Sequence, residues 1–460
     1  MATSTASSEA KPFKTLSASS KHASSKPLNA APGLLLASPI IRRLPNGLTI
    51  IAEQMPVEAV NLSLWLNIGS RVESDAINGI AHFLEHMIFK GTPRIGCGEF
   101  ERLIEERGAI TNAATSQDYT HYYITSAPKD FATLAPLQVE LVMNPSLQND
   151  HFNRERPIIL EEIRRAQDSP GRRMFYRSME MSFDRLPYRR PVLGVAGIVQ
   201  GLTAEQMRAF HHTWYQPQNM TAVAVGNLPV EELIGVVEAS FERALALGNR
   251  EHSSSALALQ APSTQAEQPF QAVQRKEYAD EALQQARLVM GWRVPGMREL
   301  EQTYPLDVVA SVLSQGRTAR MVDDLRERRH LVNAISASNM TFSHQGVFYI
   351  SAQVLVENLA EVEAAILEHI QQLHEVLVTA EELHRIQTQV ANRYIFGSET
   401  PSDRANLYGY YQAMTGDIHH ALDYPERIRR VSAKDVQAAA RRYLPLEAYG
   451  IVTLKPASVV

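Results

Sequence analysis

Two histidines and a glutamate interrupt an otherwise apolar stretch, Gly79 to Thr92, with the sequence GIAHFLEHMIFKGT. His82, Glu85 and His86 would lie on one face of an α-helix, because residues three and four positions apart are neighbours there. Two imidazoles at i and i+4 can bind one cation, and His-x-x-Glu-His is the inverted counterpart of the His-Glu-x-x-His metalloprotease motif. The spacing therefore predicts a catalytic zinc site in which Glu85 accepts a proton from water.

A catalytic zinc ion usually takes a third protein ligand, and the segment Phe152 to Asp168 (FNRERPIILEEIRRAQD) offers carboxylates beside apolar residues. Glu155 and Glu162 are seven residues apart and share a helix face, whereas Glu161 is turned about 100° away. This pattern favours a ligand from the shared face, with Glu161 as the competitor. Pro157 is expected in or near the first turn of the helix, where a missing N–H is tolerated.

The overall composition sets limits on the function. The chain has 460 residues, of which 45% are hydrophobic and 21% charged, with a net charge of -5. This is typical of a soluble globular protein long enough for two or three domains. The mild acidity gives no reason to expect a nucleic-acid partner, and no apolar run is long enough to span a bilayer. Cys97 is the only cysteine, which excludes an intrachain disulfide and a cysteine-based zinc finger.

Two stretches of biased composition divide the chain. Residues 1–38 are rich in Ser, Ala and Lys, with Glu9 as the only acid. They are interpreted either as the disordered tail of a cytoplasmic protein or as a transit peptide for organelle import. Residues 248–273, rich in Ser, Ala, Gln and Pro, are predicted to form a linker. The linker separates a metal-bearing catalytic domain, 39–247, from a metal-free domain, 274–460.

The two halves look like repeats of one unit. Each ends with a Thr or Ser helix cap, a short helix, Tyr-x-Pro and a strand, in LTAEQMRAFHHTWYQPQNMTAVAVGN and VSAKDVQAAARRYLPLEAYGIVTLKP. Each begins with a strand-like run followed by a helical pattern. We therefore predict an α+β fold of two homologous repeats, each a mostly antiparallel sheet with helices packed on one face. The second repeat lacks the metal motif, because the equivalent positions are Asp307, Ala310 and Ser311.

From about Pro39 onward, the chain resembles the pitrilysin family of zinc peptidases, which includes insulysin and the β subunit of mitochondrial processing peptidase. The resemblance rests on HFLEHMIFKGT, GAITNAATSQDYTHYY and ERPIILEEIRRAQDSP, together with YQPQNMTAVAVGN and GSETPSDRANLYGYY. It implies a zinc endopeptidase that hydrolyses unstructured peptides or presequences. Two other interpretations stay open: a non-catalytic scaffold of the same fold, and a peptide-binding protein that does not cleave.

The resemblance also implies a role for each residue of the predicted site. His82, His86 and Glu162 would bind Zn²⁺. Glu85 would act as the general base and then as the general acid towards the leaving amine. Glu155 would orient the metal ligands from the second shell of the site.

A substrate strand and a partner chain are implied in the same way. The family's edge strand, to which a peptide substrate adds as an extra β-strand, is matched by Asn112, Ala113, Ala114 and Thr115. Family members that act alone carry in their second half an Arg and, seven residues later, a Tyr that help hold the substrate carbonyl. Here Arg326 is kept, but Asn333 replaces the Tyr. We therefore expect a heterodimer whose second, homologous chain supplies the Arg/Tyr pair. The alternative is a homodimer in which Asn333 or a nearby tyrosine substitutes.

Overall fold

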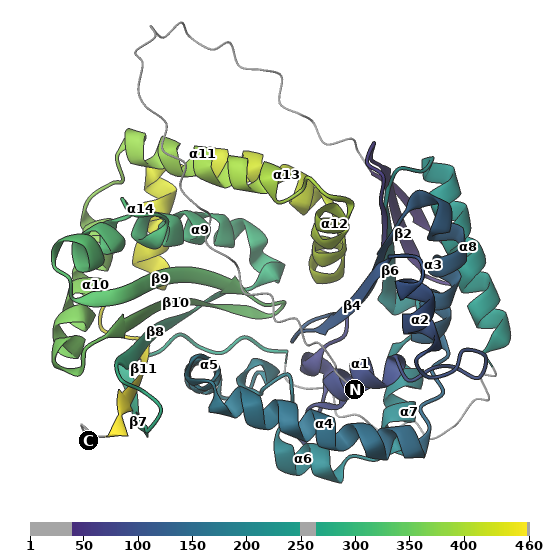
Figure 1. Cartoon of the computed structure of the whole chain (residues 1–460). Coiled ribbons are helices and arrows are strands. Elements are labelled where there is room, and N and C mark those ends of the chain that lie inside the picture. The colour runs from purple at the N-terminus through teal and green to yellow at the C-terminus, as the bar shows by residue number, and fades with distance from the viewer. Residues whose placement is uncertain (1–38, 249–263, 458–460) are drawn as a thin grey trace, which may run out of the picture. The chain divides into compact units, whose positions relative to one another are not determined.

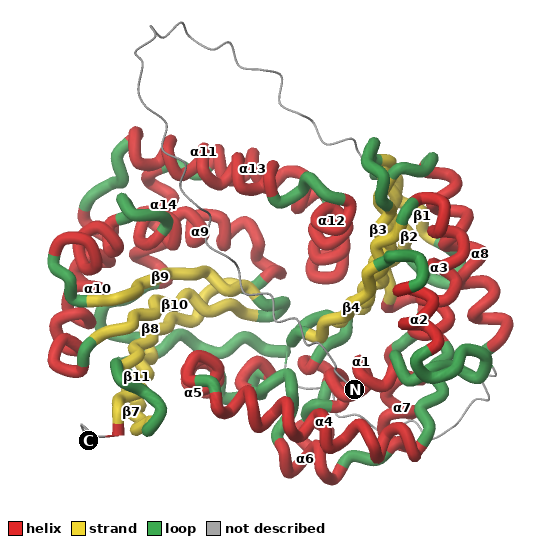
Figure 2. Tube along the Cα trace, in the orientation of Figure 1, coloured by secondary structure: helices red, strands yellow, loops and turns green. Residues whose placement is uncertain are grey.

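The computed structural model describes residues 39–248 and 264–457 (Figure 1). The segment 1–38, interpreted above as a tail or a transit peptide, lies outside the described residues. None of the helices in the described ranges is long and apolar enough to cross a membrane. Figure 2 shows two separate groups of strands, each bordered by helices.

The first sheet is built from the first half of the chain. Its strands are β1 (Ile40–Arg43), β2 (Thr49–Gln54), β3 (Val60–Leu66), β4 (Ile110–Thr115), β5 (Thr120–Ser126) and β6 (Met220–Gly226). They lie in the order β1-β2-β6-β3-β5-β4. All neighbouring strands are antiparallel except β2 and β6. Strand β4 therefore forms one edge of this sheet.

The second sheet repeats this topology. Its strands are β7 (Gln274–Asp280), β8 (Ala286–Pro295), β9 (Val332–Thr341), β10 (Gln345–Val354) and β11 (Gly450–Pro456). Their order, β7-β11-β8-β10-β9, matches β2-β6-β3-β5-β4 strand by strand, and again only the first pair is parallel. The predicted α+β fold of two repeats with mostly antiparallel sheets is thereby confirmed.

Helices of each half cover one face of that half's own sheet. The first half holds α1 (Ile80–Ile88), α2 (Glu99–Glu105), α3 (Pro128–Met143), α4 (Asn149–Asp168), α5 (Pro170–Ser182), α6 (Ala196–Gly201), α7 (Ala204–Trp214) and α8 (Val230–Leu247). Figure 1 shows α3 and α8 beside the first sheet, and their apolar side chains share a core with Leu62, Leu64 and Ala222. The burial of these groups is the main stabilising contribution to this layer.

The second half is layered in the same way. It holds α9 (Leu300–Ser314), α10 (Leu359–Glu375), α11 (Ala380–Phe396), α12 (Pro401–Thr415), α13 (His419–Arg430) and α14 (Ala433–Tyr443). The core under α9, α10 and α14 includes Trp292, Phe348 and Ile451. The final helix of each repeat, α7 or α14, begins with a capping box, at Thr203 and Ser432 respectively.

Each half also lends one helix to the other. Helix α5 of the first half packs on β8 and β11 through Met174 and Met181. Helix α12 of the second half packs on β3 and β6, where Tyr408 contacts the side of the first sheet that carries Trp65 and Val223. The central strands of each sheet are therefore covered on both faces, which explains why β3 and β6 are buried along their whole length.

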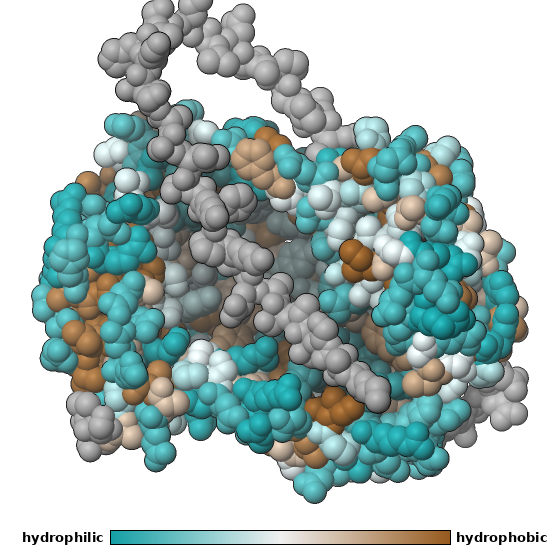
Figure 3. All heavy atoms as spheres, in the orientation of Figure 1, coloured by the Kyte–Doolittle hydropathy of each residue, from teal (hydrophilic) through white to brown (hydrophobic). Residues whose placement is uncertain are grey.

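The structure describes only part of the predicted linker, 248–273. Residues 249–263 lie outside the described residues, whereas residues 264–273 are exposed except for the buried Glu267 and Phe270. The buried carboxylate of Glu267 accepts hydrogen bonds from the backbone N–H groups of Asp184, Arg185 and Leu186. The described part of this segment is thus held by specific contacts, as buried polar groups require. On the face shown in Figure 3, hydrophobic residues form separate patches in a mostly hydrophilic surface.

Candidate metal centre

Helices α1 and α4 bring two histidines and one glutamate together. His82, His86 and Glu162 each offer a ligand atom, and these atoms all lie within 4.8 Å of one another. Glu162 Oε2 is 3.5 Å from Nε2 of His82 and 3.5 Å from Nε2 of His86. The two imidazole centroids are 4.9 Å apart. Side chains from two different helices therefore meet in the arrangement that the family resemblance implies.

The donor set fits a divalent metal ion. His82 is 7% exposed, and its Nδ1 is buried with no hydrogen-bond partner among the described residues, so that the ring is not held by a polar network of its own. Two imidazole nitrogens and one carboxylate oxygen form the ligand set of several catalytic zinc sites, which keep a fourth position for water. The side chain of Glu162 is 39% exposed, so the cluster is open to solvent on that side.

Glu155 holds His86 from the opposite side of the ring. Its Oε1 lies 3.0 Å from His86 Nδ1, and its Oε2 lies 2.7 Å from Lys90 Nζ. In the metal-bound form, a proton on Nδ1 shared with this carboxylate would leave the Nε2 lone pair free to bind the ion. Glu155 is 5% exposed although it is an acid, because these two partners compensate its burial.

The competitor Glu161 lies on the solvent side of α4. Its carboxylate pairs with Arg164 at 2.8 Å and with Arg165 at 3.0 Å, and these hydrogen bonds lower its pKa to about 2. Pro157 was expected near the first turn, but α4 begins at Asn149 and includes Pro157 in its interior. That expectation is wrong. The residue is tolerated because Pro157 and Asn153, whose carbonyl loses the hydrogen bond, are exposed to water.

The three grouped side chains differ in their protonation. Burial, together with the nearby His86 charge, lowers the pKa of His82 to about 4, which leaves this imidazole neutral at physiological pH. Burial alone would lower the pKa of His86, but hydrogen bonds to Glu155 and Glu162 outweigh it and raise the pKa to about 9. The hydrogen bond with His86 lowers the pKa of Glu162.

Glu85 lies on the same helix between the two histidines and reaches strand β4. Thr115 Oγ1 donates a 2.5 Å hydrogen bond to Glu85 Oε2. Burial raises the pKa of Glu85, and the Thr115 hydroxyl partly opposes this shift. Thr115, predicted to bind substrate, thus also fixes the orientation of the carboxylate predicted to act as the base.

The remaining predicted substrate residues lie on the same edge strand. The side chains of Asn112 and Ala114 are exposed, whereas Ala113 is half-buried and packs against the core. Asn112 Oδ1 accepts a hydrogen bond from the backbone N–H of Ala113 at 2.9 Å. Strand β4 pairs with β5 on one side only and contacts α1. Its outer edge has the geometry that strand addition requires.

Arg326 and Asn333 lie in the second half of the chain. Arg326 belongs to a π-helical turn, Val322–Arg328, and its guanidinium pairs with the neighbouring Glu327 at 2.7 Å. Asn333, at the start of β9, donates a 2.6 Å hydrogen bond to Gln285 Oε1. The described contacts of both residues are with neighbours in their own half, so the substrate role of Arg326 stays a prediction.

Glu73 is a structural residue of the site that the sequence did not reveal. It is fully buried and accepts hydrogen bonds from the backbone N–H groups of Gly79 and Ala81 and from Asn78 Nδ2, each at 2.9 Å. It thus caps the first turn of α1, where Gly79 adopts a φ of 99° that favours glycine. The spacing of six residues from Gly79 is not a known capping pattern, so no sequence signal identifies it.

Two further residues near the site, Arg172 and Tyr176, were not identified from the sequence. They lie four residues apart on α5, so they share a helix face. The charge of Arg172 acts on the pKa of both His82 and Glu162, and its guanidinium lies beside the Tyr176 hydroxyl. A positive group and a phenol therefore stand next to the candidate metal centre.

Among its described residues, the second half carries no equivalent centre. Asp307, at the position equivalent to His82, accepts hydrogen bonds from Asn339 Nδ2 at 2.8 Å and from the Tyr424 hydroxyl at 3.1 Å. Burial raises the pKa of this carboxyl to about 6. Ser311 Oγ donates to the backbone carbonyl of Asp307 within the helix. This constellation is a satisfied polar network rather than a metal-ligand set.

Two models of one protein family match consecutive parts of the chain. The model described as "Insulinase (Peptidase family M16)" matches residues 48–195, which contain all the candidate metal ligands. The model described as "Peptidase M16 inactive domain" matches residues 201–390. Together the two matches span most of the described chain.

Similar proteins carry consistent names. An uncharacterized zinc protease of Streptomyces coelicolor is 28% identical over 403 residues, covering 87% of this chain and 86% of the relative. Zinc protease PqqE of Helicobacter pylori is 26% identical, covering 90% and 92%. The crystal structure of a protease from Helicobacter pylori superposes with a TM-score of 0.83 at 25% identity, covering 91% of this chain and 99% of that one. The chain therefore belongs to the insulinase family of peptidases, M16, which is the pitrilysin family that its sequence resembles.

Proposed function

We propose that this protein is a zinc-dependent endopeptidase that hydrolyses unstructured peptides. The observation that carries the proposal is the convergence of His82, His86 and Glu162 from two helices, with Glu85 beside them and β4 within contact of α1. The zinc protease names of the full-length relatives support the same metal and the same reaction. Presequences are one class of substrate that this geometry would accommodate.

The residues of the chain divide the chemical work. His82, His86 and Glu162 would hold the zinc ion, and Glu155 fixes the ring of His86 through Nδ1. Zinc, when bound, supplies a Lewis acid that polarises the scissile carbonyl and acidifies the attacking water. Glu85 takes the proton from that water and passes it to the leaving nitrogen.

The free edge of β4 is proposed to bind the substrate. An extended peptide that pairs with Asn112–Thr115 would make main-chain hydrogen bonds that do not depend on its side chains. The Thr115 hydroxyl, bonded to Glu85, joins this strand to the catalytic carboxylate. This mode of binding excludes folded substrates, because the segment that is cut must be free to add as a strand.

A partner chain is proposed on the basis of Asn333. The family's second-half tyrosine is replaced by an amide that is bonded to Gln285. A second homologous chain that carries both the Arg and the Tyr would complete the substrate site as a heterodimer. The alternative is a homodimer in which Asn333 or a nearby tyrosine substitutes, and Tyr176, beside Arg172 on α5, is one such tyrosine.

The test compares two adjacent glutamates. Wild-type protein is expected to contain about one zinc per chain and, together with its co-purified partner, to cleave an unstructured, internally quenched peptide. Glu162→Ala should lose both the metal and the activity, since one of three ligands is removed. Glu161→Ala is the matched control and should keep both, because Glu161 only pairs with surface arginines. Zinc content is measured by plasma mass spectrometry.

The other outcomes separate the competing functions. A metal-free wild-type protein, or equal zinc content in the two variants, would leave a non-catalytic scaffold as the function. A protein that binds zinc and peptide but yields no product, even with its co-purified partner, would indicate a peptide-binding role. Co-purification from the native source tests the heterodimer, which predicts a second chain of similar size without a His-x-x-Glu-His motif.

A further inference from the structure

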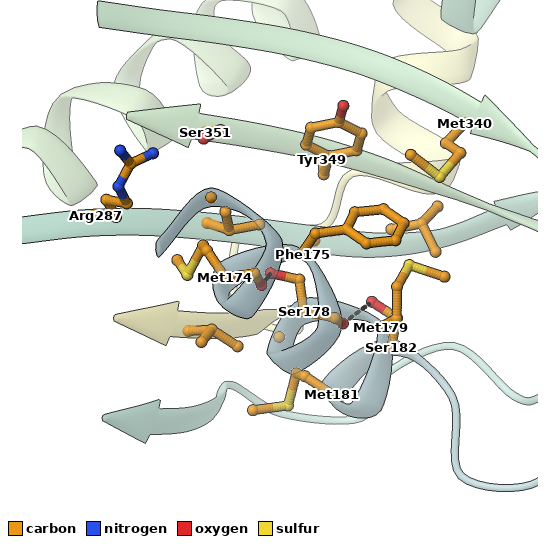
Figure 4. A pocket seen from close by; sticks show the side chains of 16 residues that line it. Met174, Phe175, Ser178, Met179, Met181, Ser182, Arg287, Met340, Tyr349 and Ser351 are labelled. Atoms are coloured by element: carbon orange, nitrogen blue, oxygen red, sulfur yellow. Dashed lines mark hydrogen bonds between the residues drawn. The ribbon is translucent and has the colours of Figure 1, made fainter. Parts of the chain in front are cut away.

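A cavity of about 200 Å³ lies between the borrowed helix α5 and the second sheet (Figure 4). None of the candidate metal ligands or substrate residues lines this cavity. The walls of the cavity contain four methionines, Met174, Met179, Met181 and Met340, together with Phe175.

Small residues on both sides leave this space open. Gly291 of β8 pairs with Gly450 of β11, and Met181 fills the space beside Gly450, where a Cβ would lie 2.8 Å from Met181 Cγ. A Cβ built at Gly291 would come no closer than 3.6 Å to any atom, at Ser182 Oγ and Val347 Cγ1. On the helix side, the hydroxyls of Ser178 and Ser182 donate to carbonyls of their own helix. The hollow therefore presents a mainly apolar lining.

One end of the cavity carries an uncompensated positive charge. Arg287 forms no ion pair or hydrogen bond among the described residues, and its Nε is buried without an acceptor. By contrast, Arg293, six residues later on the same strand, has acceptors for the hydrogen bonds of its guanidinium. Its guanidinium bonds the carbonyls of Ser182 and Gln268 and the carboxylate of Asp184. Arg287 is partly buried, and no carboxylate among the described residues pairs with it.

The amino terminus of α5 lies at the same end. Arg287 Nη1 is 3.9 Å from the position of a Cβ built at Gly171, the second residue of the helix. The side chain of the N-cap residue Ser169 accepts no hydrogen bond from the helix. The backbone N–H groups in the first turn of α5 are therefore not capped by it. Helix dipole and guanidinium therefore favour an anion at this end of an otherwise apolar cavity. Figure 4 shows Arg287 and Met340 at opposite ends of the group of lining residues.

We propose that this cavity binds an apolar monocarboxylate, with its carboxylate at Arg287 and its tail among the methionines. A cavity of roughly 150 Å³ accepts a benzene-sized group, so the volume here suits a tail of about six to eight carbon atoms. Methionine side chains are flexible and polarizable, and they adapt to tails of different shape. Such a ligand is either a short free fatty acid or the carboxy-terminal apolar residue of a peptide.

The test measures binding by isothermal titration calorimetry with hexanoate, 3-phenylpropionate, and the peptides acetyl-Ala-Ala-Phe and acetyl-Ala-Ala-Phe-amide. Binding of the carboxylates but not of hexanol or the amide is expected. Arg287→Met should weaken binding about 10- to 100-fold, the range for a charge-assisted hydrogen bond of 1.5–3 kcal/mol. Gly291→Val, which fills the hollow, should abolish it. Arg317→Met, at an exposed arginine, is the control that should bind normally.

The outcomes assign the source of the ligand or reject the site. Binding of the free acids alone points to fatty acids, and binding of the peptide carboxylate alone points to peptide ends. Absence of binding by every carboxylate, or unchanged affinity in Arg287→Met with a wild-type melting temperature, overturns the proposal. Glu162→Ala should bind these acids as the wild type does, so failure of the proposed peptidase function leaves this test intact.

Discussion

His86 contacts two carboxylates of α4 at the candidate metal centre, Glu155 and Glu162. Its Nδ1 contacts Glu155 and its Nε2 faces Glu162, so the ring cannot rotate without losing both partners. Spacing placed the two histidines on one helix face and Glu155 with Glu162 on another, and the family resemblance implied that these two faces meet. The sequence could not predict the bond from Thr115 to Glu85, because that contact depends on how β4 is placed against α1.

Substitution of Glu85 by Gln isolates its proposed role. Gln can still accept the hydrogen bond of Thr115 but cannot take up and return a proton. We expect zinc content to be unchanged and kcat to fall about 10²- to 10⁴-fold, the range for loss of general acid–base catalysis. Peptide turnover and metal content are measured on the same preparation, with Glu161→Gln as the control. Turnover close to the wild-type rate would refute Glu85 as the base.

The first turn of α1 depends on a buried acid outside the helix. Glu73 is the acceptor for three donors, and Arg190 lies near it and donates to the Glu73 carbonyl at 2.8 Å. The five residues between Glu73 and Gly79 follow an irregular path through a short 3-10 turn. This path cannot be inferred from spacing, which explains why the helix was predictable and its cap was not.

Glu73→Ala should therefore destabilise the protein strongly. Buried donors left without an acceptor cost about 1–3 kcal/mol each, so the loss of this cap should exceed about 3 kcal/mol in the free energy of unfolding. Glu73→Gln keeps one oxygen acceptor and should have a smaller effect. Thermal unfolding and zinc affinity are the measurements, and the exposed Glu105→Ala is the control. Equal melting temperatures for Glu73→Ala and wild type would contradict the capping role.

Helix α9 carries a pH-sensitive group in the second half. The carboxyl of Asp307 has its pKa raised by burial from 3.8 to about 6, so the folded state binds the proton more tightly than the unfolded state. Between these two values, stability falls as the pH rises, and above about pH 6 the full loss is present.

Asp307→Asn removes this titration while its amide can still serve Asn339 and Tyr424. We expect the variant to gain stability relative to the wild type at about pH 8, on the order of 1–3 kcal/mol, and to gain less at about pH 5. Urea unfolding midpoints at the two pH values provide the comparison. A variant that is equally or more destabilised at the higher pH would show that Asp307 is stabilised as a carboxylate.

The two sheets and their own helices could be predicted from repeated patterns. The caps at Thr203 and Ser432 and the Tyr-x-Pro that follows each helix occur at matching places in both halves. The exchange of α5 and α12 could not be predicted, because an amphipathic pattern states that a face is buried but not against what. The ion pair between Glu53 of β2 and Arg404 of α12 likewise joins residues with no pattern in common.

The exchange predicts that neither half folds alone. Residues 39–248 without α12 would expose the apolar face around Trp65 and Val223, and exposed faces of this kind lead to aggregation. Expressed singly, this fragment should be insoluble or lack fixed tertiary structure. Co-expressed with residues 264–460, it should form a soluble complex that elutes as one species in gel filtration. A monodisperse first half with cooperative thermal unfolding would contradict this prediction.

The borrowed helix α12 also determines when the molecule can be completed during its synthesis. Strand β3 leaves the ribosome early, yet the helix that covers its second face begins only at Pro401. Ribosomes add about 5–20 residues per second, so the inner surface of the first sheet waits for roughly 17–70 seconds before its cover exists. During that interval the nascent chain exposes an apolar, strand-rich surface. This topology therefore requires that a chaperone bind the nascent chain until α12 has been made.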